Sequence, residues 1–421
     1  MPKSLLGFLA SLLFICCACQ VCNGYSILTH EEIVDLLWAD QIKPLLMAKY
    51  PHVTEDELRK AHAYAYGGCL IQDMGYYPFG NKTFSDMVHY VRSGDFVQAL
   101  LDEATDVNEY AFALGALAHY ASDIVGHPVV NAAVAREFPK LKAKYGPSVT
   151  YVEDKKAHIR TEFGFDVVQV AKQRYTSDSY RAFIGFEVAK PVLQRAFLKT
   201  YGIPLEDVFG NLDLSIGSFR WAVSRAIPEM TKVAVETKKD EMVKENPSFA
   251  KNKFLYNLSR SEYEKEWGKN YQKPGFGARF LAALFKIIPK VGPFKAIAFK
   301  MPYPDTETAY LKSVNDTVER YKVCLRVLKR KDDLTLTNTD FDTGKLTRSG
   351  EYSLADETYA KLLDKLADSN FSGLSHDLRK NILDFYQDPN APNATRKKRD
   401  RWNKTMAELE QLKATQVAAA Q

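Results

Sequence analysis

Apolar positions over residues 25–239 recur at helical spacing, and the alternation typical of strands is scarce. Three segments begin with side chains that cap helices, where an acidic residue follows the capping residue by three positions. The capping pairs are Thr29 with Glu32, Thr54 with Glu57, and Asp106 with Glu109. Gly67 and Gly68 predict the end of the second helix, and Pro128 predicts that the third ends just before it. A further helix is predicted over 153–170, so the pattern indicates an all-α fold.

The first 24 residues have a different pattern. Lys3 precedes a short apolar run over residues 5–15, and small residues follow, which is typical of a secretory signal peptide. We therefore expect the mature chain to begin at Tyr25 and to be secreted, periplasmic or in the cell envelope. A lipid-modified start at Cys19 or Cys22 is the alternative, but the residues before them form a poor lipobox.

Residues 240–421 are expected to form a mostly helical C-terminal extension after a helical domain over 25–239. Residues 267–304 contain no acidic residue, and a basic amphipathic segment lies within them at 279–300. Such a segment is typical of a helix packed on the main domain, or of peripheral contact with an anionic membrane surface. No uninterrupted apolar stretch after the first two dozen residues is long enough to predict a transmembrane helix.

Charge and cysteine content narrow the function classes. The net charge of +5 is mild for 421 residues and does not by itself indicate a nucleic-acid partner. Removal of a signal peptide would leave only Cys69 and Cys324, which do not make a disulfide framework. Both are predicted to be buried small apolar groups, with an isolated bridge between them as the alternative.

One apolar segment carries metal-binding side chains. In "ALAHYASDIVGHP", His119, Asp123 and His127 are each four residues apart, so a helix places them on one stripe. Their neighbours are small or apolar, which predicts burial. A buried carboxylate beside two imidazoles is costly unless the groups are partnered. The spacing therefore favours a metal site over an ordinary core helix.

Other histidines extend this pattern. His158 and Glu162 form a second pair at helical spacing, a common arrangement of two zinc ligands, with Asp166 further along the same stripe. His30 lies in the first turn of the first mature helix, and Asp73 and His89 bracket a loop rich in Gly and Pro. His52 and His376 are expected to be ordinary surface residues, whereas His62 is ambiguous.

These residues, in this order, resemble the zinc-dependent phospholipase C/D family, which is related to the S1/P1 nucleases. The matching segments are Tyr25, "LTH", "QDMGYYP", "VHY", "HYASDIVGH" and "AHIRTEFGFD", and the match ends near Asp166. The chain closely resembles a group of bacterial envelope proteins that contain this domain. The resemblance implies a helical bundle of the phospholipase C/P1 nuclease type that holds three zinc ions.

The resemblance also implies which residues bind each ion. One zinc would be held by Asp73, His89, His119 and Asp123. A second would share Asp123 and take His30 and the main-chain amine and carbonyl of Tyr25, where many members have Trp. The third would be held by His127, His158 and Glu162.

The implied activity is hydrolysis of a phosphodiester, with phospholipid as the leading substrate. Adjacent zinc ions activate water and neutralise phosphoryl charge, and the third would stabilise the leaving alkoxide. Asp73 is the candidate to orient or deprotonate the water. One alternative is a nuclease or nucleotidase of the S1/P1 type, in which a base stacks on Tyr76, Tyr77 or Phe79. Another is a non-catalytic envelope protein stabilised by zinc.

Overall fold

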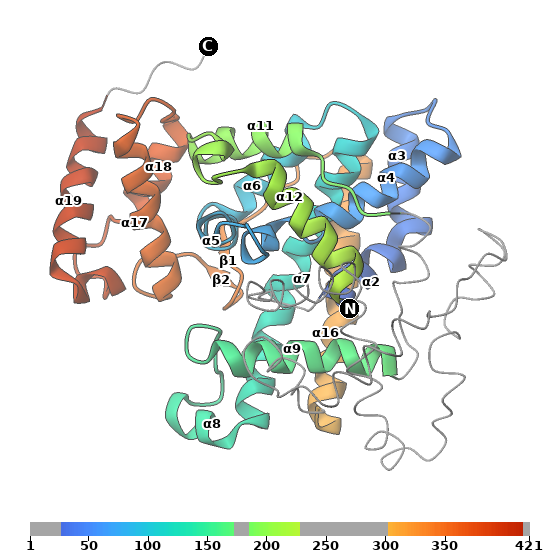
Figure 1. Ribbon diagram of the computed structural model, residues 1–421, viewed down its shortest axis with the longest axis horizontal. Coiled ribbons are helices and arrows are strands. Elements are labelled where there is room, and N and C mark those ends of the chain that lie inside the picture. Colours follow the sequence, from blue (N-terminus) through green and yellow to red (C-terminus); the bar gives the residue numbers. More distant parts are fainter. Residues whose placement is uncertain (1–26, 172–184, 228–301, 416–421) are drawn as a thin grey trace, which may run out of the picture.

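The computed structural model describes residues 27–171, 185–227 and 302–415, and helices dominate it (Figure 1). The predicted all-α fold is therefore confirmed. The helices of the first two stretches are α2 (Ile27–Leu37), α3 (Lys43–Lys49), α4 (Glu55–Gly68), α5 (Lys82–Tyr90), α6 (Ser93–Glu103), α7 (Val107–Glu137), α8 (Pro139–Tyr145), α9 (Lys155–Ala171), α11 (Lys190–Tyr201) and α12 (Leu212–Trp221). The third stretch contains α16 (Pro304–Arg330), α17 (Ser353–Asp368), α18 (His376–Phe385) and α19 (Arg399–Ala414).

The third stretch also contains a small antiparallel hairpin, in which β1 (Thr339–Asp340) pairs with β2 (Lys345–Leu346). It follows α16 and precedes α17, and it lies beside α5 and α7 (Figure 1). The expected signal peptide, Tyr25, the 239/240 boundary and the basic segment at 279–300 lie outside the described residues.

Helix α7 is the centre of the fold. It packs against α2, α4, α6, α9 and α16, and most of its residues are buried. Two glycines allow α4 and α7 to approach backbone to backbone. A Cβ on Gly115 would lie 2.1 Å from the carbonyl oxygen of Ala65, and one on Gly68 would lie 1.9 Å from that of Phe112. This close crossing brings the chain that follows α4 next to the middle of α7.

The prediction that α7 ends before Pro128 is wrong, because the helix continues through this proline to Glu137. Proline has no N–H, so the carbonyl of Ile124 lacks its usual helical donor. Gly344 of the hairpin covers this carbonyl, and a Cβ there would come within 2.7 Å of the Ile124 oxygen. Packing of α7 against the surrounding helices thus outweighs the local cost of the proline.

The expected caps are confirmed for two of the three helices. Thr54 and Glu57 form the full capping box of α4, and the side chain of Asp106 accepts hydrogen bonds from two backbone N–H groups at the start of α7. Thr29, by contrast, lies inside α2 and caps nothing. Its hydroxyl donates to Asp166 of α9 over 3.1 Å, so a tertiary contact replaces the predicted local one.

The C-terminal stretch packs directly on the central helices. Helix α16 runs against α7, where the hydroxyl of Tyr321 donates to the carbonyl of Leu114 over 2.8 Å, and α17 packs on α5. Cys69 and Cys324 are both buried and form no disulfide with each other, as expected for small apolar side chains.

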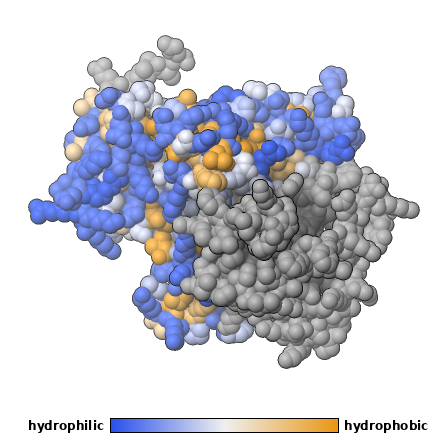
Figure 2. All heavy atoms as spheres, viewed as in Figure 1, coloured by the Kyte–Doolittle hydropathy of each residue, from blue (hydrophilic) through white to orange (hydrophobic). Residues whose placement is uncertain are grey.

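In the described part of the chain, no helix is long and apolar enough to cross a membrane. Figure 2 shows hydrophobic residues gathered over α11 and α12, whereas the face over α17 to α19 is mostly hydrophilic. Three large apolar side chains on α11 and α12 are exposed, namely Leu198, Leu214 and Trp221.

Candidate metal centre

The structure brings together every predicted metal ligand that lies within the described residues. Helix α2 supplies His30, the 3₁₀ turn over Ile71–Tyr76 supplies Asp73, and α5 supplies His89. Helix α7 supplies His119, Asp123 and His127, and α9 supplies His158 and Glu162. All of these side chains are buried. The implied ligands from Tyr25 lie outside the described residues.

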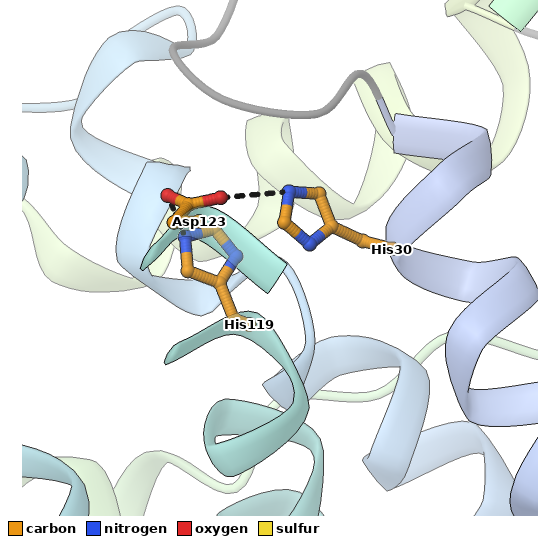
Figure 3. A group of neighbouring side chains, drawn as sticks. All are labelled: His30, His119 and Asp123. Atoms are coloured by element: carbon orange, nitrogen blue, oxygen red, sulfur yellow. Dashed lines mark ion pairs between the residues drawn. The ribbon is translucent and has the colours of Figure 1, made fainter. Parts of the chain in front are cut away.

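Asp123 is the hub of the centre. One carboxylate oxygen, Oδ1, lies 3.4 Å from His30 Nε2. The other, Oδ2, lies 3.1 Å from His119 Nε2, 3.6 Å from His89 Nε2 and 3.5 Å from His127 Nε2. Figure 3 shows how His30, from α2, and His119 and Asp123, from α7, point toward one another. Four imidazoles thus present the same ring nitrogen to a single carboxylate.

Backbone carbonyls fix the orientation of two of these rings. His89 Nδ1 donates to the carbonyl of Ser85 over 2.7 Å, and His119 Nδ1 donates to that of Cys69 over 2.9 Å. A proton held at Nδ1 leaves the lone pair on Nε2, which faces the carboxylates. The two rings are therefore prepared to bind a cation at Nε2.

The donor atoms form three groups that could hold a metal ion. The groups are His30 with His119 and Asp123, Asp73 with His89 and His119, and His127 with His158 and Glu162. His119 takes part in the first two groups, whereas the family resemblance implied that it binds only one ion. In the third group His158 Nδ1 lies 2.6 Å from Glu162 Oε1.

The carboxylates raise the pKa of two histidines. Burial alone would lower the pKa of His89, but Asp123 and Asp73 raise it to about 10. At His127, the effect of Asp123 likewise outweighs that of burial and raises the pKa to about 9. Without a cation, these two imidazoles are held in their charged form at neutral pH.

The remaining shifts have the opposite direction. Burial, with the neighbouring His127, lowers the pKa of His158 to about 3. Burial and His119 hold the pKa of His30 well below its usual range. Burial would raise the pKa of Asp123, but His119 and His127 hold it well below its usual range. Asp123 is therefore ionised and His30 and His158 are neutral, the forms that bind zinc, whereas His89 and His127 must release a proton to bind it.

The lack of hydrogen bonds at the buried carboxylate and imidazole atoms fits a metal centre. Among the described residues, both carboxylate oxygens of Asp73 and of Asp123 lack a hydrogen-bond partner although they are buried, as do Nε2 of His89 and Nε2 of His119. Buried polar groups are ordinarily satisfied, and an unpaired buried carboxylate is costly. Imidazole nitrogens and carboxylate oxygens are among the ligands that Zn²⁺ takes in proteins.

The other histidines are outside the centre. His52 and His376 are exposed, as predicted. His62 is buried, 2.9 Å from Asp35, and its ring stacks on Trp38 at a centroid distance of 3.8 Å. This side chain belongs to a separate polar contact between α2 and α4.

Asp166 lies outside the three metal-binding groups. It accepts a hydrogen bond from the backbone N–H of Leu28 over 3.0 Å, in addition to the bond from Thr29. It therefore anchors the start of α2, the helix that carries His30.

The three aromatic residues after Asp73 have different environments. Tyr76 is buried, and its ring centroid lies 5.9 Å from that of His89. Tyr77 packs against Phe219 in the core, with a centroid distance of 5.0 Å. Phe79 is exposed. Of the three, Tyr76 is thus the ring beside a predicted metal ligand.

The sequence interpretation missed several residues at the centre. Asn131 continues the stripe of α7 four positions after His127, so helical spacing alone could have identified it. Asp342 and Phe341 come from the hairpin and carry no motif that links them to the histidines. The Phe341 ring lies 5.2 Å from that of His89, and its backbone N–H donates to the His89 carbonyl over 3.3 Å.

Comparison with known proteins supports the same type of centre. Residues 29–211 match the family model described as Zinc dependent phospholipase C. This stretch contains all the side chains of the three metal-binding groups. No curated protein and no solved structure matches the chain.

Proposed function

Because residues 29–211 belong to the zinc-dependent phospholipase C family, we propose that the protein uses a three-zinc centre to hydrolyse phosphodiesters, with phospholipid as its substrate. The observation that carries this proposal is the position of Asp123, which lies among four imidazole Nε2 atoms. A carboxylate in this position can serve two ions at once.

We assign the ligands as follows. His30 and Asp123 would hold one ion together with the Tyr25 terminus. Asp73, His89, His119 and Asp123 would hold the next. His127, His158 and Glu162 would hold the third. Zinc at these positions would supply Lewis-acid activation of water and neutralise the charge on the phosphoryl oxygens.

The residues of the chain have defined tasks in this reaction. The imidazoles donate lone pairs and stay neutral when the ions are bound. We assign Asp73 as the general base or the group that orients the attacking water, because it is a buried carboxylate 3.4 Å from His89. The buried setting excludes bulk water and strengthens each electrostatic contact.

The proposal includes the route to the mature protein. We infer that residues 1–24 are a signal peptide and that the chain is secreted or periplasmic, because the amine of Tyr25 exists only after cleavage. His30 follows Tyr25 by five positions and faces Asp123. N-terminal sequencing of the secreted protein tests this inference: a start at Tyr25 is expected, and a lipid-modified Cys19 or Cys22 would contradict it.

A substrate assay tests the activity. The zinc-loaded protein is incubated in parallel with phosphatidylcholine liposomes and with single-stranded DNA. We expect release of a phosphorylated headgroup from the liposomes, and its loss after treatment with a chelator. Cleavage of DNA without lipid hydrolysis would instead support the nuclease alternative. No hydrolysis of either substrate by a protein that retains zinc would favour the non-catalytic alternative.

A further inference from the structure

The loop of the β1–β2 hairpin places a carboxylate against a predicted metal ligand. Asp342 Oδ1 lies 3.5 Å from Nδ1 of His127, and both side chains are fully buried. His127 presents its other nitrogen, Nε2, to Asp123. The imidazole therefore lies between a carboxylate of the central helix and one from the C-terminal part of the chain.

Two tyrosines hold this carboxylate in place. Its other oxygen, Oδ2, accepts a hydrogen bond from the hydroxyl of Tyr90 over 3.0 Å and a second from that of Tyr352. Tyr90 ends α5 and Tyr352 precedes α17, and their rings are 5.5 Å apart. The orientation of Asp342 is thus fixed from two sides, and Oδ1 is left facing His127.

The backbone of Asp342 acts on a second ligand through Asn131. The side-chain N–H of Asn131 donates to the Asp342 carbonyl over 2.7 Å, so the amide oxygen must point the other way. That oxygen lies 2.8 Å from Nε2 of His158. An oxygen there holds the His158 proton at Nε2 and leaves the lone pair on Nδ1, which faces Glu162.

We propose that Asp342 is a positioning residue for the third metal position, which it prepares through His127 directly and through His158 by way of Asn131. A carboxylate at Nδ1 of His127 favours the tautomer with its proton there, so that Nε2 is free to bind a cation. This inference rests on the proposed function, because it takes the group of His127, His158 and Glu162 as a zinc position. It means that a segment outside the family match completes the metal centre.

The variant Asp342→Asn tests the proposal with little change in shape. The amide oxygen can take the place of Oδ2 and accept from both tyrosines, which leaves the NH₂ group facing Nδ1 of His127. The neutral ring of His127 is then favoured to accept at Nδ1 and to carry its proton at Nε2, so zinc must bind against the preferred tautomer. Asp333→Asn is the matched control. It makes the same chemical change at an exposed residue that precedes the hairpin.

The measurement is zinc per chain after equilibration of the full mature protein in zinc buffers of graded strength. We expect three ions in the parent and in the control. In Asp342→Asn the affinity for one ion should fall about 10- to 100-fold, while the other two ions are unaffected. Excess zinc should restore the third ion. Asn131→Ala leaves the Asp342 carboxylate intact, and it should lower the affinity for the same ion.

Each outcome has a distinct meaning. Equal affinity for three ions in the parent and in Asp342→Asn would overturn the positioning role and leave the proposed function standing. Fewer than three ions in the parent would contradict the three-zinc proposal itself. The melting temperature of the metal-free proteins shows whether each variant folds. If neither variant folds, Asp342 and Asn131 serve the fold as a whole and the positioning role is overturned.

Discussion

At the scale of single residues, the centre is built on one carboxylate. Asp123 lies between ligands from α2, α5 and α7, and it has no hydrogen bond within the described residues. The i, i+4 spacing within α7 predicted a metal-binding stripe, and the family resemblance implied that Asp123 is shared by two ions. The distances to His30 and His89, from other helices, follow only from the packing.

Replacement of Asp123 should therefore remove more than one ion. In Asp123→Asn we expect loss of the two ions that share this carboxylate, and a fall in hydrolysis of at least about 100-fold. Elemental analysis and the liposome assay measure the two effects. Asp102→Asn, at an exposed position on α6, is the control. Retention of all the zinc by Asp123→Asn would show that the carboxylate is not a shared ligand.

The pKa shifts predict how the metal-free protein responds to pH. His89 and His127 have pKa values raised from 6.5 to about 10 and about 9. Their stabilising contribution is complete below pH 6.5 and is lost as the pH rises through 9 to 10. His158, with a pKa lowered to about 3, has the opposite effect, and its cost to stability grows as the pH falls below 6.5.

The metal-free protein should therefore be most stable near pH 6.5, and the melting temperature should fall on either side. Zinc must displace the protons on His89 and His127, so the rise in melting temperature on adding zinc should grow between pH 6.5 and pH 9. Thermal unfolding with and without zinc across this range measures both effects. A zinc-induced rise that shrinks with pH would contradict the proton displacement.

At the scale of the elements, α7 shows where sequence reasoning succeeded and where it did not. Its cap at Asp106 and its polar stripe are local features, and both were predicted. Its passage through Pro128 was not, because the compensating contact comes from Gly344, far along the chain. Thr29 failed as a predicted cap for the same reason, since its partner Asp166 belongs to another helix.

The contact at Pro128 can be tested through the glycine. Gly344 has a φ of +69°, and a Cβ would lie 2.7 Å from the Ile124 oxygen. Gly344→Ala should thus destabilise the protein by at least about 1–3 kcal/mol. Gly217→Ala is a control with the opposite sign, because a Cβ in this exposed turn of α12 meets no atom within 4 Å. That change should stabilise the protein by about 0.5–1 kcal/mol. Denaturant unfolding measures both, and an unchanged stability in Gly344→Ala would contradict the close contact.

At the scale of the whole molecule, the part that matches the family is in direct contact with the C-terminal part. Helix α16 packs on α7, and the hairpin contacts α5 and α7 through Phe341, Asp342 and Gly344. Asp342 and Asn131 are 211 positions apart, a distance over which no spacing rule applies. The sequence therefore predicted the ligands of the proposed centre but not the residues that support them.

This packing predicts that the two parts unfold together. Phe341→Ala removes a buried ring that lies 5.2 Å from His89 and 5.6 Å from Tyr120. It should cost about 3–5 kcal/mol and lower the temperature of a single unfolding transition. Calorimetry of the metal-free protein measures this. Two separate transitions, with only one displaced, would show that the C-terminal part unfolds by itself.

The account depends most on the metal centre, and the most direct test is the number of zinc ions per folded chain. Elemental analysis of the mature full-length protein, purified without chelator and equilibrated with zinc, provides this number. We expect three ions per chain, all removed by a strong chelator and restored by added zinc. A folded protein that binds no zinc would contradict the centre and the proposed activity.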